Sequence, residues 1–238
     1  NEFAKLDPQV RRKVFTVREK VWEQFDQALG KSWTAREFPL LAEWLLVNQE
    51  SLKLVQQASR RRRYYSPLIS TEKGLPMVSV LLPGLVQYRE LARALSIRIT
   101  MNMSQGKVDE VIADSVTCHR LGRLVGQGPF LIDSLVGIAI DSLASQADVM
   151  AAHYGKLPPE KIKAWRQQLQ GLTPLPPVVE RINVGERFSY LDVTFGIVRF
   201  GPSALDQLDE LDEMGGASED KKPGFKDVVS KAVLNTIS

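Results

Sequence analysis

The sequence is poor in the side chains that build disulfides and metal sites. It contains 1 cysteine and 2 histidines among its 238 residues. The lone Cys118 excludes an internal disulfide framework, and together with His119 and His153 it supplies too few ligands for a structural zinc site. We therefore expect no metal and no cofactor. The redox compartment stays open, because a chain without disulfides is permitted in any of them.

The sequence also has no large excess of charge of either sign. The 31 basic and 28 acidic residues leave a formal net charge of +3, which does not by itself indicate a nucleic-acid or acidic partner. An apolar stretch at residues 130–152 is interrupted by Asp133, Asp141 and Asp148, whereas a membrane-spanning helix has about 20 mainly apolar residues with few charges. We interpret this stretch as a helix of the core.

Catalytic signatures are missing as well, since the sequence has no glycine-rich phosphate loop, no GxSxG elbow and no HExxH motif. Cys118 and His119 are adjacent, and neighbouring helical residues point about 100° apart, so they do not pair as thiolate and base. We expect a packed thiol and a hydrogen-bonded histidine, with Asp114 five residues before it. Asp133 and Asp141 lie about 12 Å apart along a helix, wider than the roughly 5 to 9.5 Å of a glycosidase pair.

Helical periodicity is the strongest positive signal, and it is centred on residues 85–153. Apolar residues recur there at spacings of three and four in three segments, separated by Gly106 and by a glycine-rich break before Phe130. The pattern predicts an antiparallel helical hairpin followed by a third helix. The third segment is apolar nearly all the way round, with Leu135 and Ile138 among its apolar positions, which predicts a central helix packed on several sides.

The remaining segments fit the same fold class. Residues 64–83 lose the helical spacing and contain three prolines, which predicts a long surface loop with one short strand or turn at 78–82. The sequence thus predicts an all-α fold, either an irregular helical bundle or a short superhelix of antiparallel helix hairpins. Further helices are predicted at residues 8–29, 34–58, 162–172 and 186–200.

The chain is expected to divide into one helical domain, residues 1–202, and a tail, residues 203–238. The window 203–220 holds seven acidic residues and no basic one, which is typical of a solvated linker. Residues 221–238 have the pattern of a detached amphipathic helix. The sequence begins at Asn1 and not at methionine, which indicates a mature fragment, so any signal or anchor that preceded it is invisible. The localisation stays open, and the soluble part of a membrane-anchored or exported protein is one of the alternatives.

One helical corner resembles a known repeat unit. Gly106 and the acidic pair Asp109 and Glu110 resemble the turn of a tetratricopeptide hairpin, although the upstream signature and a second copy near 34 residues away are missing. The resemblance implies a helical hairpin and leaves an irregular bundle as the preferred arrangement.

A second resemblance is carried by three segments, LPGLVQYRELARALSIR (82–98), DEVIADSVTCHRLGRLVGQGPFLIDSLVGIAI (109–140) and GERFSYLD (185–192). In their order and spacing they resemble a group of uncharacterised bacterial proteins, over about residues 44–192. The resemblance implies a wholly helical domain that follows a hydrophobic N-terminal segment. It carries over no catalytic residue.

Arginines provide the candidate binding residues of the first hairpin. If the hairpin closes at residues 104–107, its antiparallel register brings Arg98 near Asp114. The same register gathers one basic patch, formed by Arg89, Arg93, Arg120 and Arg123. A patch of this kind could bind a carboxylate or phosphate. Alternatively, the neighbouring Glu90, Asp114 and Glu110 neutralise it in structural ion pairs, and we favour this interpretation.

A second cluster of candidate binding residues follows the predicted helix 34–58. It consists of Arg60, Arg61, Arg62, Arg63, Tyr64 and Tyr65. Guanidinium groups beside aromatic rings could bind a phosphate backbone while a base stacks, or could bind an anionic lipid surface. The interpretation we favour is a solvated helix C-terminus whose dipole the arginines complement.

Three functions are compatible with these observations. We favour a helical protein–protein interaction or scaffold module without catalysis, because periodic apolar content is high and catalytic patterns are missing. One alternative is a small-molecule-binding or enzymatic helical domain with a cleft between helices. The other is a peripheral binder of anionic membrane or nucleic acid through Arg60–Arg63. The expected partner is accordingly a protein, and the oligomeric state stays open.

Overall fold

The computed structural model describes residues 19–28, 30–65, 67 and 82–200. Residues 19–28 are helical. The elements that follow are α2 (Pro39–Val47), α3 (Gln49–Ala58), α4 (Leu82–Ser104), α5 (Val108–Val125), α6 (Leu131–Tyr154), α7 (Pro159–Gln170), α8 (Val178–Arg181), the π-helix η3 (Ile182–Glu186) and α9 (Arg187–Phe200). These ranges contain no strand, which confirms the all-α prediction.

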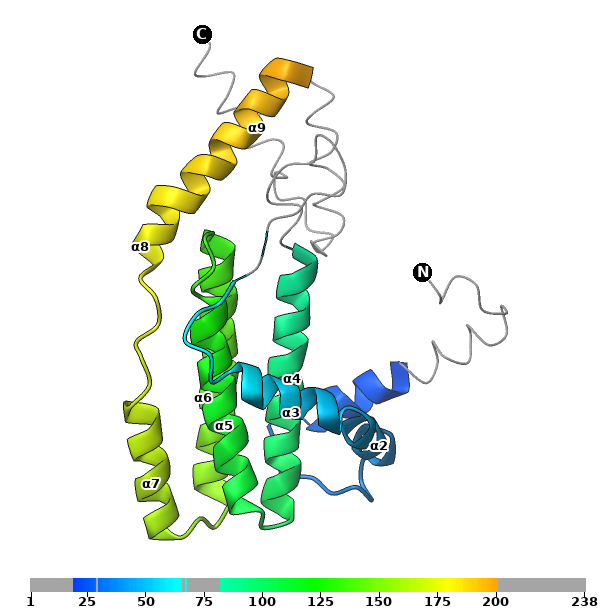
Figure 1. Ribbon diagram of the computed structural model, residues 1–238. Helices are drawn as coiled ribbons and strands as arrows, with labels where there is room; N and C mark the ends of the chain where they lie inside the picture. Colours follow the sequence, from blue (N-terminus) through cyan, green and yellow to red (C-terminus); the bar gives the residue numbers. More distant parts are fainter. Residues whose placement is uncertain (1–18, 29, 66, 68–81, 201–238) are drawn as a thin grey trace, which may run out of the picture.

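Three long helices, α4, α5 and α6, form an antiparallel bundle (Figure 1). The turn between α4 and α5 depends on Gly106, whose φ of +67° lies in the left-handed region that residues with a side chain disfavour. The predicted break at Gly106 is therefore confirmed. Within the bundle α5 is the most enclosed helix, since 11 of its 18 residues are buried.

The prediction that the third helix is central was wrong. In α6 only 8 of 24 residues are buried, and Leu135 and Ile138 are 49% and 42% exposed. Ile140 and Ala144, on the side that faces α4 and α5, are fully buried. A helix with apolar residues all the way round can pack on any of its sides. Which side is buried depends on where the neighbouring helices lie.

Glycines allow α5 and α6 to approach each other closely. A Cβ atom added to Gly122 would lie 2.7 Å from the backbone oxygen of Gly137, and one added to Gly137 would lie 2.6 Å from that of Gly122. Gly126 lies against the same contact. No side chain larger than hydrogen fits between the two backbones, so this crossing fixes how the helices pack.

A layer of shorter helices, made of residues 19–28, α2 and α3, covers one side of the bundle, with α3 crossing in front of it (Figure 1). The fully buried Trp33 ties this layer down, because its Nε1 donates to the Ile97 carbonyl oxygen at 3.2 Å and to Thr100 Oγ1 at 3.1 Å. The helix predicted over 34–58 is split at Asn48, whose side-chain amide donates to the Trp44 carbonyl oxygen at 2.8 Å.

On another side of the bundle, α7 packs on α5 through the buried Trp165. This contact belongs to a second hydrophobic cluster, which also contains Ile99, Val116 and Ala147. The first cluster, around Trp33 and Leu95, lies between the bundle and the shorter helices. The two clusters together make the core of the described residues.

Beyond α7 the chain runs back along the bundle and forms a helical limb, defined here as α8, η3 and α9. Its base is fixed on the start of α6, where Glu186 Oε1 accepts the Leu131 N–H at 2.8 Å. Gly185 lies so close to Pro129 that an added Cβ would be 2.0 Å from its carbonyl oxygen. Above this base, α9 extends past the end of the bundle (Figure 1).

Several sequence predictions fall at or outside the limits of the description. The loop predicted near residues 64–83 ends earlier, because Leu82 and Pro83 belong to α4. Most of the strand or turn predicted at 78–82, the first part of the helix predicted at 8–29, and the whole tail 203–238 lie outside the described residues.

Candidate functional site

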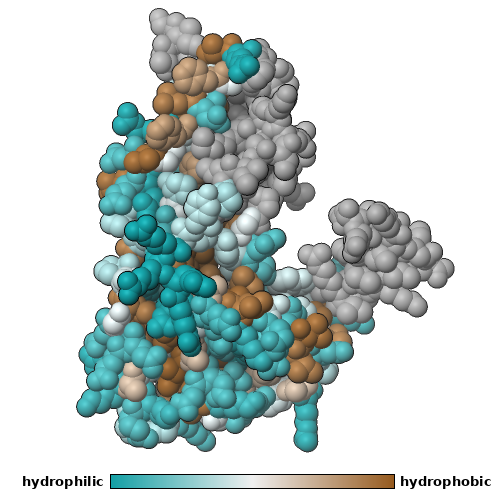
Figure 2. Space-filling view, viewed as in Figure 1, coloured by the Kyte–Doolittle hydropathy of each residue, from teal (hydrophilic) through white to brown (hydrophobic). Residues whose placement is uncertain are grey.

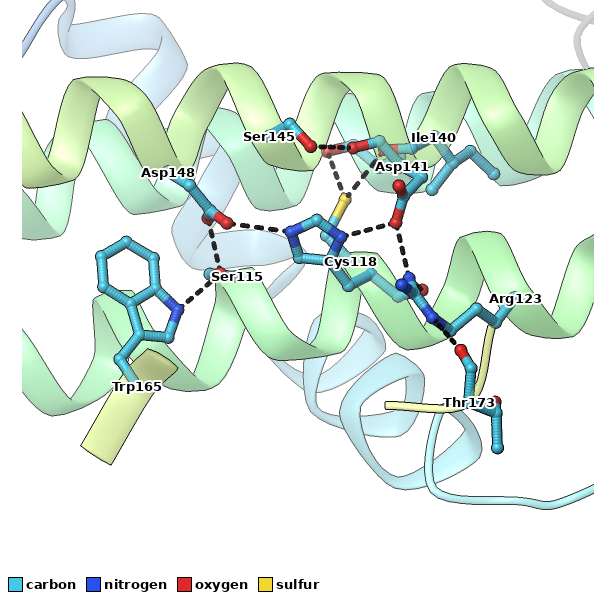
Figure 3. A network of polar contacts seen from close by, with 11 residues as sticks. Ser115, Cys118, Arg123, Ile140, Asp141, Ser145, Asp148, Trp165 and Thr173 are labelled. Carbon is cyan, nitrogen blue, oxygen red and sulfur yellow. Dashed lines mark hydrogen bonds and ion pairs between the residues drawn. The ribbon is translucent and has the colours of Figure 1, made fainter. Parts of the chain in front are cut away.

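The densest polar network among the described residues joins one face of α5 to one face of α6 (Figure 3). On α5, Ser115, His119 and Arg123 follow one another at intervals of four and therefore share a face. On α6, Asp141 and Asp148 are seven residues apart and share the opposing face. The contact between the two helices thus encloses one imidazole between two carboxylates.

His119 is held as an imidazolium by this geometry. Its Nδ1 lies 2.6 Å from Asp141 Oδ1 and its Nε2 lies 2.9 Å from Asp148 Oδ2. Ionised carboxylates only accept hydrogen bonds, so both ring nitrogens must carry a proton. Burial by itself lowers the pKa of His119, but the hydrogen bonds and charges of the two aspartates outweigh it and raise the pKa to about 9.

Arg123 completes one end of the network. Its Nη1 donates to Asp141 Oδ1 at 2.6 Å and to the His119 carbonyl oxygen at 2.9 Å, while its Nε donates to the Thr173 carbonyl oxygen at 2.6 Å. Burial alone would raise the pKa of Asp141, but the hydrogen bonds from His119 and Arg123 outweigh burial and lower it. Asp141 is therefore an ionised carboxylate between two cations.

The other end of the network reaches α7. Ser115 donates its hydroxyl to Asp148 Oδ1 at 2.6 Å and accepts the indole N–H of Trp165 at 3.0 Å. Figure 3 shows Trp165 and Thr173 on opposite flanks of the same network. The contacts thus connect α5, α6, α7 and the segment after α7.

Chemically, this arrangement clamps α5 to α6. A protonated His119 has no free nitrogen to act as a general base, and each aspartate already accepts hydrogen bonds from two partners. Cys118, which precedes His119 on α5, points between α4 and α6, with Sγ 4.0 Å from the Ala92 carbonyl oxygen and 3.8 Å from that of Ile140. Burial raises the pKa of this thiol, so it is the packed, unreactive side chain that the sequence predicted.

A second buried ion pair lies between α4 and α5. Arg98 donates from Nε to Asp114 Oδ2 at 2.7 Å and from Nη2 to Asp114 Oδ1 at 2.6 Å. Gln56 of α3 donates to the same carboxylate at 2.7 Å. Burial raises the pKa of Asp114, and the hydrogen bonds from Arg98 offset part of that rise. The predicted proximity of Arg98 and Asp114 is confirmed.

The predicted patch of Arg89, Arg93, Arg120 and Arg123 is divided between different neighbours. Arg93 faces the helix at 19–28, where its guanidinium lies 5.5 Å from the centre of the Phe25 ring and 3.5 Å from Glu90 Oε1. Arg123 faces α6, as described above. Each of these two arginines has a carboxylate of its own, Arg89 is exposed and Arg120 is half-buried. The predicted neutralisation fits Arg93, which pairs with Glu90, whereas Arg123 pairs with Asp141 and with none of the three predicted carboxylates.

The predicted cluster Arg60–Arg63 lies on the surface, in the turn after α3, and all four residues are exposed. Its backbone is held by Gln127, which accepts the Tyr64 N–H at 3.0 Å and donates to the Arg62 carbonyl oxygen at 3.2 Å. The Tyr64 ring packs edge-on against Tyr88, whereas Tyr65 is 85% exposed. Figure 2 shows strongly hydrophilic atoms where the chain leaves α3.

The sequence analysis named Asp141 and Asp148 as charges that interrupt an apolar stretch, but missed them as the partners of His119. It expected a hydrogen-bonded His119 and named Asp114 as the nearest carboxylate, but Asp114 faces α4 and pairs with Arg98. The available signal was the spacing of four on α5 and of seven on α6. To predict the contact from this spacing, one must know how far α6 is shifted along α5. The five-residue connection Gly126–Phe130 does not determine that shift.

Two searches of the described residues complete the description of the site. No group of three or more His, Cys, Asp and Glu side chains in these ranges is placed to hold a metal ion. Within the same ranges, Leu131–Tyr154 is the one helix that is long and apolar enough to cross a membrane, judged by length and composition. Its packing against α4 and α5 and its three aspartates are features of a core helix with one exposed side.

Comparison with protein-family models, curated proteins and solved structures finds no match to this chain. The resemblances to a tetratricopeptide corner and to a bacterial protein group therefore stay predictions.

Proposed function

We propose that this protein is a helical protein-interaction module that associates with a second copy of itself through α9. The observation that supports this proposal is an exposed apolar stripe on that helix. Its residues are Phe188, Leu191, Phe195 and Val198, spaced three, four and three apart and exposed by 60%, 45%, 69% and 78%. This is the spacing of the a and d positions of a coiled coil, which pack against another helix.

The position of α9 suits contact with another molecule. The limb is anchored at its base through Glu186 and Gly185, and α9 continues past the end of the bundle (Figure 1). Apolar atoms follow this part of the surface in Figure 2. An exposed apolar stripe on an anchored helix favours an interaction surface, because monomeric proteins rarely expose large contiguous apolar patches.

Charges beside the stripe favour a second copy in parallel orientation. With Phe188 at position a, Arg187 occupies position g and Asp192 occupies the following position e. In a parallel pair, residues at g face residues at e of the neighbouring helix. Arg187 would thus face Asp192 of the second copy, with opposite charges, twice in a symmetric dimer, in addition to the contact that Asp192 makes within its own chain. Two heptads make a small interface, so we expect a weak dimer.

The test is sedimentation of the full chain by analytical ultracentrifugation over a concentration range up to about 200 µM, where weak interfaces become populated. Wild type is expected to shift from monomer to dimer. Leu191→Gln with Phe195→Gln should stay monomeric and keep the helical circular dichroism, because both side chains are exposed. The matched control, Leu54→Gln with Val86→Gln, replaces apolar residues of similar exposure outside α9 and should dimerise. A monomeric wild type, or dimerisation by the α9 variant, would overturn the proposal.

A second candidate function, binding of single-stranded nucleic acid by Arg60–Arg63, is favoured by one specific observation. No carboxylate of a described residue lies within ion-pair distance of these four exposed arginines. Gln127 holds the backbone of the turn while the guanidinium groups face solvent beside the exposed Tyr65. Phosphate contacts with a stacking ring are the elements of single-strand binding.

This second candidate is tested by fluorescence anisotropy with a single-stranded RNA at low and moderate salt. Replacing Arg60–Arg63 by Gln should abolish binding. The matched control replaces four other exposed cations, Lys20, Arg36, Lys156 and Lys163, and should retain it. Wild-type binding should weaken steeply with salt, as counterion release requires. An equal loss of binding in both variants would show that net charge, and not the Arg60–Arg63 cluster, is responsible. Binding to anionic vesicles without binding to RNA would exclude nucleic acid as the ligand.

A further inference from the structure

A cleft separates the shorter helices from the end of the bundle, between α2 and α3 on one side and the end of α4 and start of α5 on the other. Its volume is about 490 Å³. This size falls within the range of roughly 300 to 1,000 Å³ that small-molecule sites occupy. The cleft is independent of the α9 surface and of the His119 clamp.

The floor of the cleft carries no net charge. Arg98 and Asp114 pair there through two hydrogen bonds, and Gln56 donates a third to the same carboxylate. Gln56 uses its N–H group in this contact, which leaves its carbonyl oxygen as an acceptor. The guanidinium keeps N–H donors that Asp114 does not use, because it has five in total.

Asn102 provides the observation that points to a ligand. It lines the cleft and is only 5% exposed. Its carboxamide makes no hydrogen bond to any other described residue, although the neighbouring Ser96, Thr100 and Ser104 hydroxyls all bond to backbone carbonyls. The nitrogen and oxygen of this amide are not sealed from solvent, so water in the cleft satisfies them in the free protein. A molecule that enters the cleft would supply both the donor and the acceptor that this amide lacks within the protein.

The walls of the cleft select the chemistry of that molecule. Leu45 and Met101 are apolar lining residues, and Leu46 is 70% exposed at the same wall. The lining also has two lysines, Lys53 and Lys107, and one further anion, Glu110; Lys53 is paired with Glu50 of α3 at 2.7 Å. Opposite charges in the lining and a neutral floor do not favour a polyanion. Carboxamides present a donor and an acceptor side by side, which matches the N–H and C=O groups of a peptide unit.

We propose that this cleft binds a short peptide-like ligand without net charge, whose main-chain amide pairs with Asn102 and whose apolar side chain packs against Leu45, Leu46 and Met101. The binding goes beyond self-association through α9 and does not depend on it.

The probe for this proposal is acetyl-Ala-Leu-Ala-amide, titrated into the full chain and followed by isothermal calorimetry and by amide chemical shifts. We expect saturable binding below about 1 mM, in keeping with the size of the ligand. Acetamide, which has the amide without the side chain, and isopentanol, which has the apolar group without the amide, should each bind at least about tenfold more weakly, because each makes only part of the contacts. Absence of binding up to about 5 mM would overturn the proposal, since affinity that weak leaves no specific site.

Two variants locate the binding. Asn102→Leu keeps the approximate volume and removes the amide; it should weaken the probe at least about tenfold, because the main-chain amide of the probe loses its partner, and should keep the helical circular dichroism. Leu46→Gln changes an exposed side chain and should weaken binding without loss of fold. Gln146→Leu, an exposed position on α6 outside the cleft, is the matched control and should bind as wild type does. Unchanged affinity in both Asn102→Leu and Leu46→Gln would exclude the cleft as the site.

Discussion

His119 connects α5 to α6 by being charged, and this makes the stability of the fold depend on pH. The folded protein holds the imidazole proton up to a pKa of about 9, whereas an unfolded chain releases it near pH 6.5. Between these values the folded state binds more protons than the unfolded state, so the free energy of unfolding falls as pH rises. Below pH 6.5, the contribution that the contacts of His119 with the two aspartates make to the free energy of unfolding is fully present.

We therefore expect wild type to lose on the order of 2 to 3 kcal/mol of its free energy of unfolding between pH 6.5 and 9.5, from the difference in pKa between the two states. Urea unfolding at a series of pH values measures this slope. His119→Gln, which cannot be protonated, should be less stable at pH 6.5 and should show a much flatter profile. A wild-type profile as flat as that of the variant would show that His119 is not an imidazolium in the folded protein.

Two isoleucines of α6 separate the buried side of that helix from its exposed side. Ile140 is fully buried and Ile138 is 42% exposed, although only one residue stands between them. Ile140→Ala should lower the free energy of unfolding by about 2 to 5 kcal/mol, as truncation in a packed core does. Ile138→Ala should lower it by less than about 1 kcal/mol, nearer to the effect of a surface substitution. The two urea midpoints test this directly, and equal losses would place both sides of α6 in the core.

At the scale of elements, the glycine contact between α5 and α6 determines how closely the two helices pack. Gly137→Ala would place a methyl group 2.6 Å from the Gly122 carbonyl oxygen and 2.9 Å from the Gly126 nitrogen. Both neighbours are backbone atoms, so no rotamer change relieves the contact. We expect a loss of about 1 to 3 kcal/mol in the free energy of unfolding, the usual effect of overpacking a core.

The control for this substitution is Gly196→Ala in α9, where an added Cβ has no atom within 4 Å. It should leave stability unchanged or raise it by up to about 1 kcal/mol, because alanine favours a helix over glycine. If Gly137→Ala unfolds at the same urea concentration as wild type, the close contact of α5 and α6 does not contribute measurably to the free energy of unfolding.

Helix positions were predictable from the sequence, whereas the faces that they bury were only partly so. Gly106 and the periodic spacing before and after it predicted α4, α5 and their register, and Arg98 does meet Asp114. A hairpin of this kind has one short turn, so its register follows from the turn alone. The contact of His119 with Asp141 and Asp148 spans 22 and 29 residues, and depends on a longer connection whose geometry the sequence does not state.

Side chains of similar character at neighbouring positions limited the rest of the prediction. Leu135 and Val136 are both apolar, yet Leu135 is 49% exposed and Val136 is 8% exposed. Arg93 and Arg123 share a charge, yet they face different carboxylates. In each case the neighbouring helix, and not the residue type, decides the environment.

At the scale of the whole molecule, the helices should differ strongly in how well their backbone amides are protected. The amides of α5 lie in a mostly buried helix, whereas α9 exposes its apolar stripe and contacts little besides the π-helix. Hydrogen exchange measured by mass spectrometry at low protein concentration should be at least about tenfold faster in α9 than in α5, because α9 opens locally without unfolding of the bundle. Equal protection of the two helices would contradict this description of the limb.

The same experiment connects to the proposed association. If α9 pairs with a second copy, raising the protein concentration should slow exchange in α9 and leave α5 unchanged, since only the paired helix gains protection. Protection that is independent of concentration would indicate that α9 meets no second copy.

The tryptophans report separately on the two hydrophobic clusters of the core in fluorescence spectroscopy. Trp33 is fully buried in the first hydrophobic cluster, with Trp22 and Trp44 packed against that cluster, whereas Trp165 lies in the second. The sequence has 4 tryptophans, so a Trp165→Phe protein emits only from the first cluster. Subtracting its fluorescence from that of wild type isolates the emission of one indole, which is linked to the charged imidazole through Ser115 and Asp148. Loss of the His119 proton would then change the emission wavelength and intensity of Trp165, whereas the emission of the three tryptophans of the first cluster would not change.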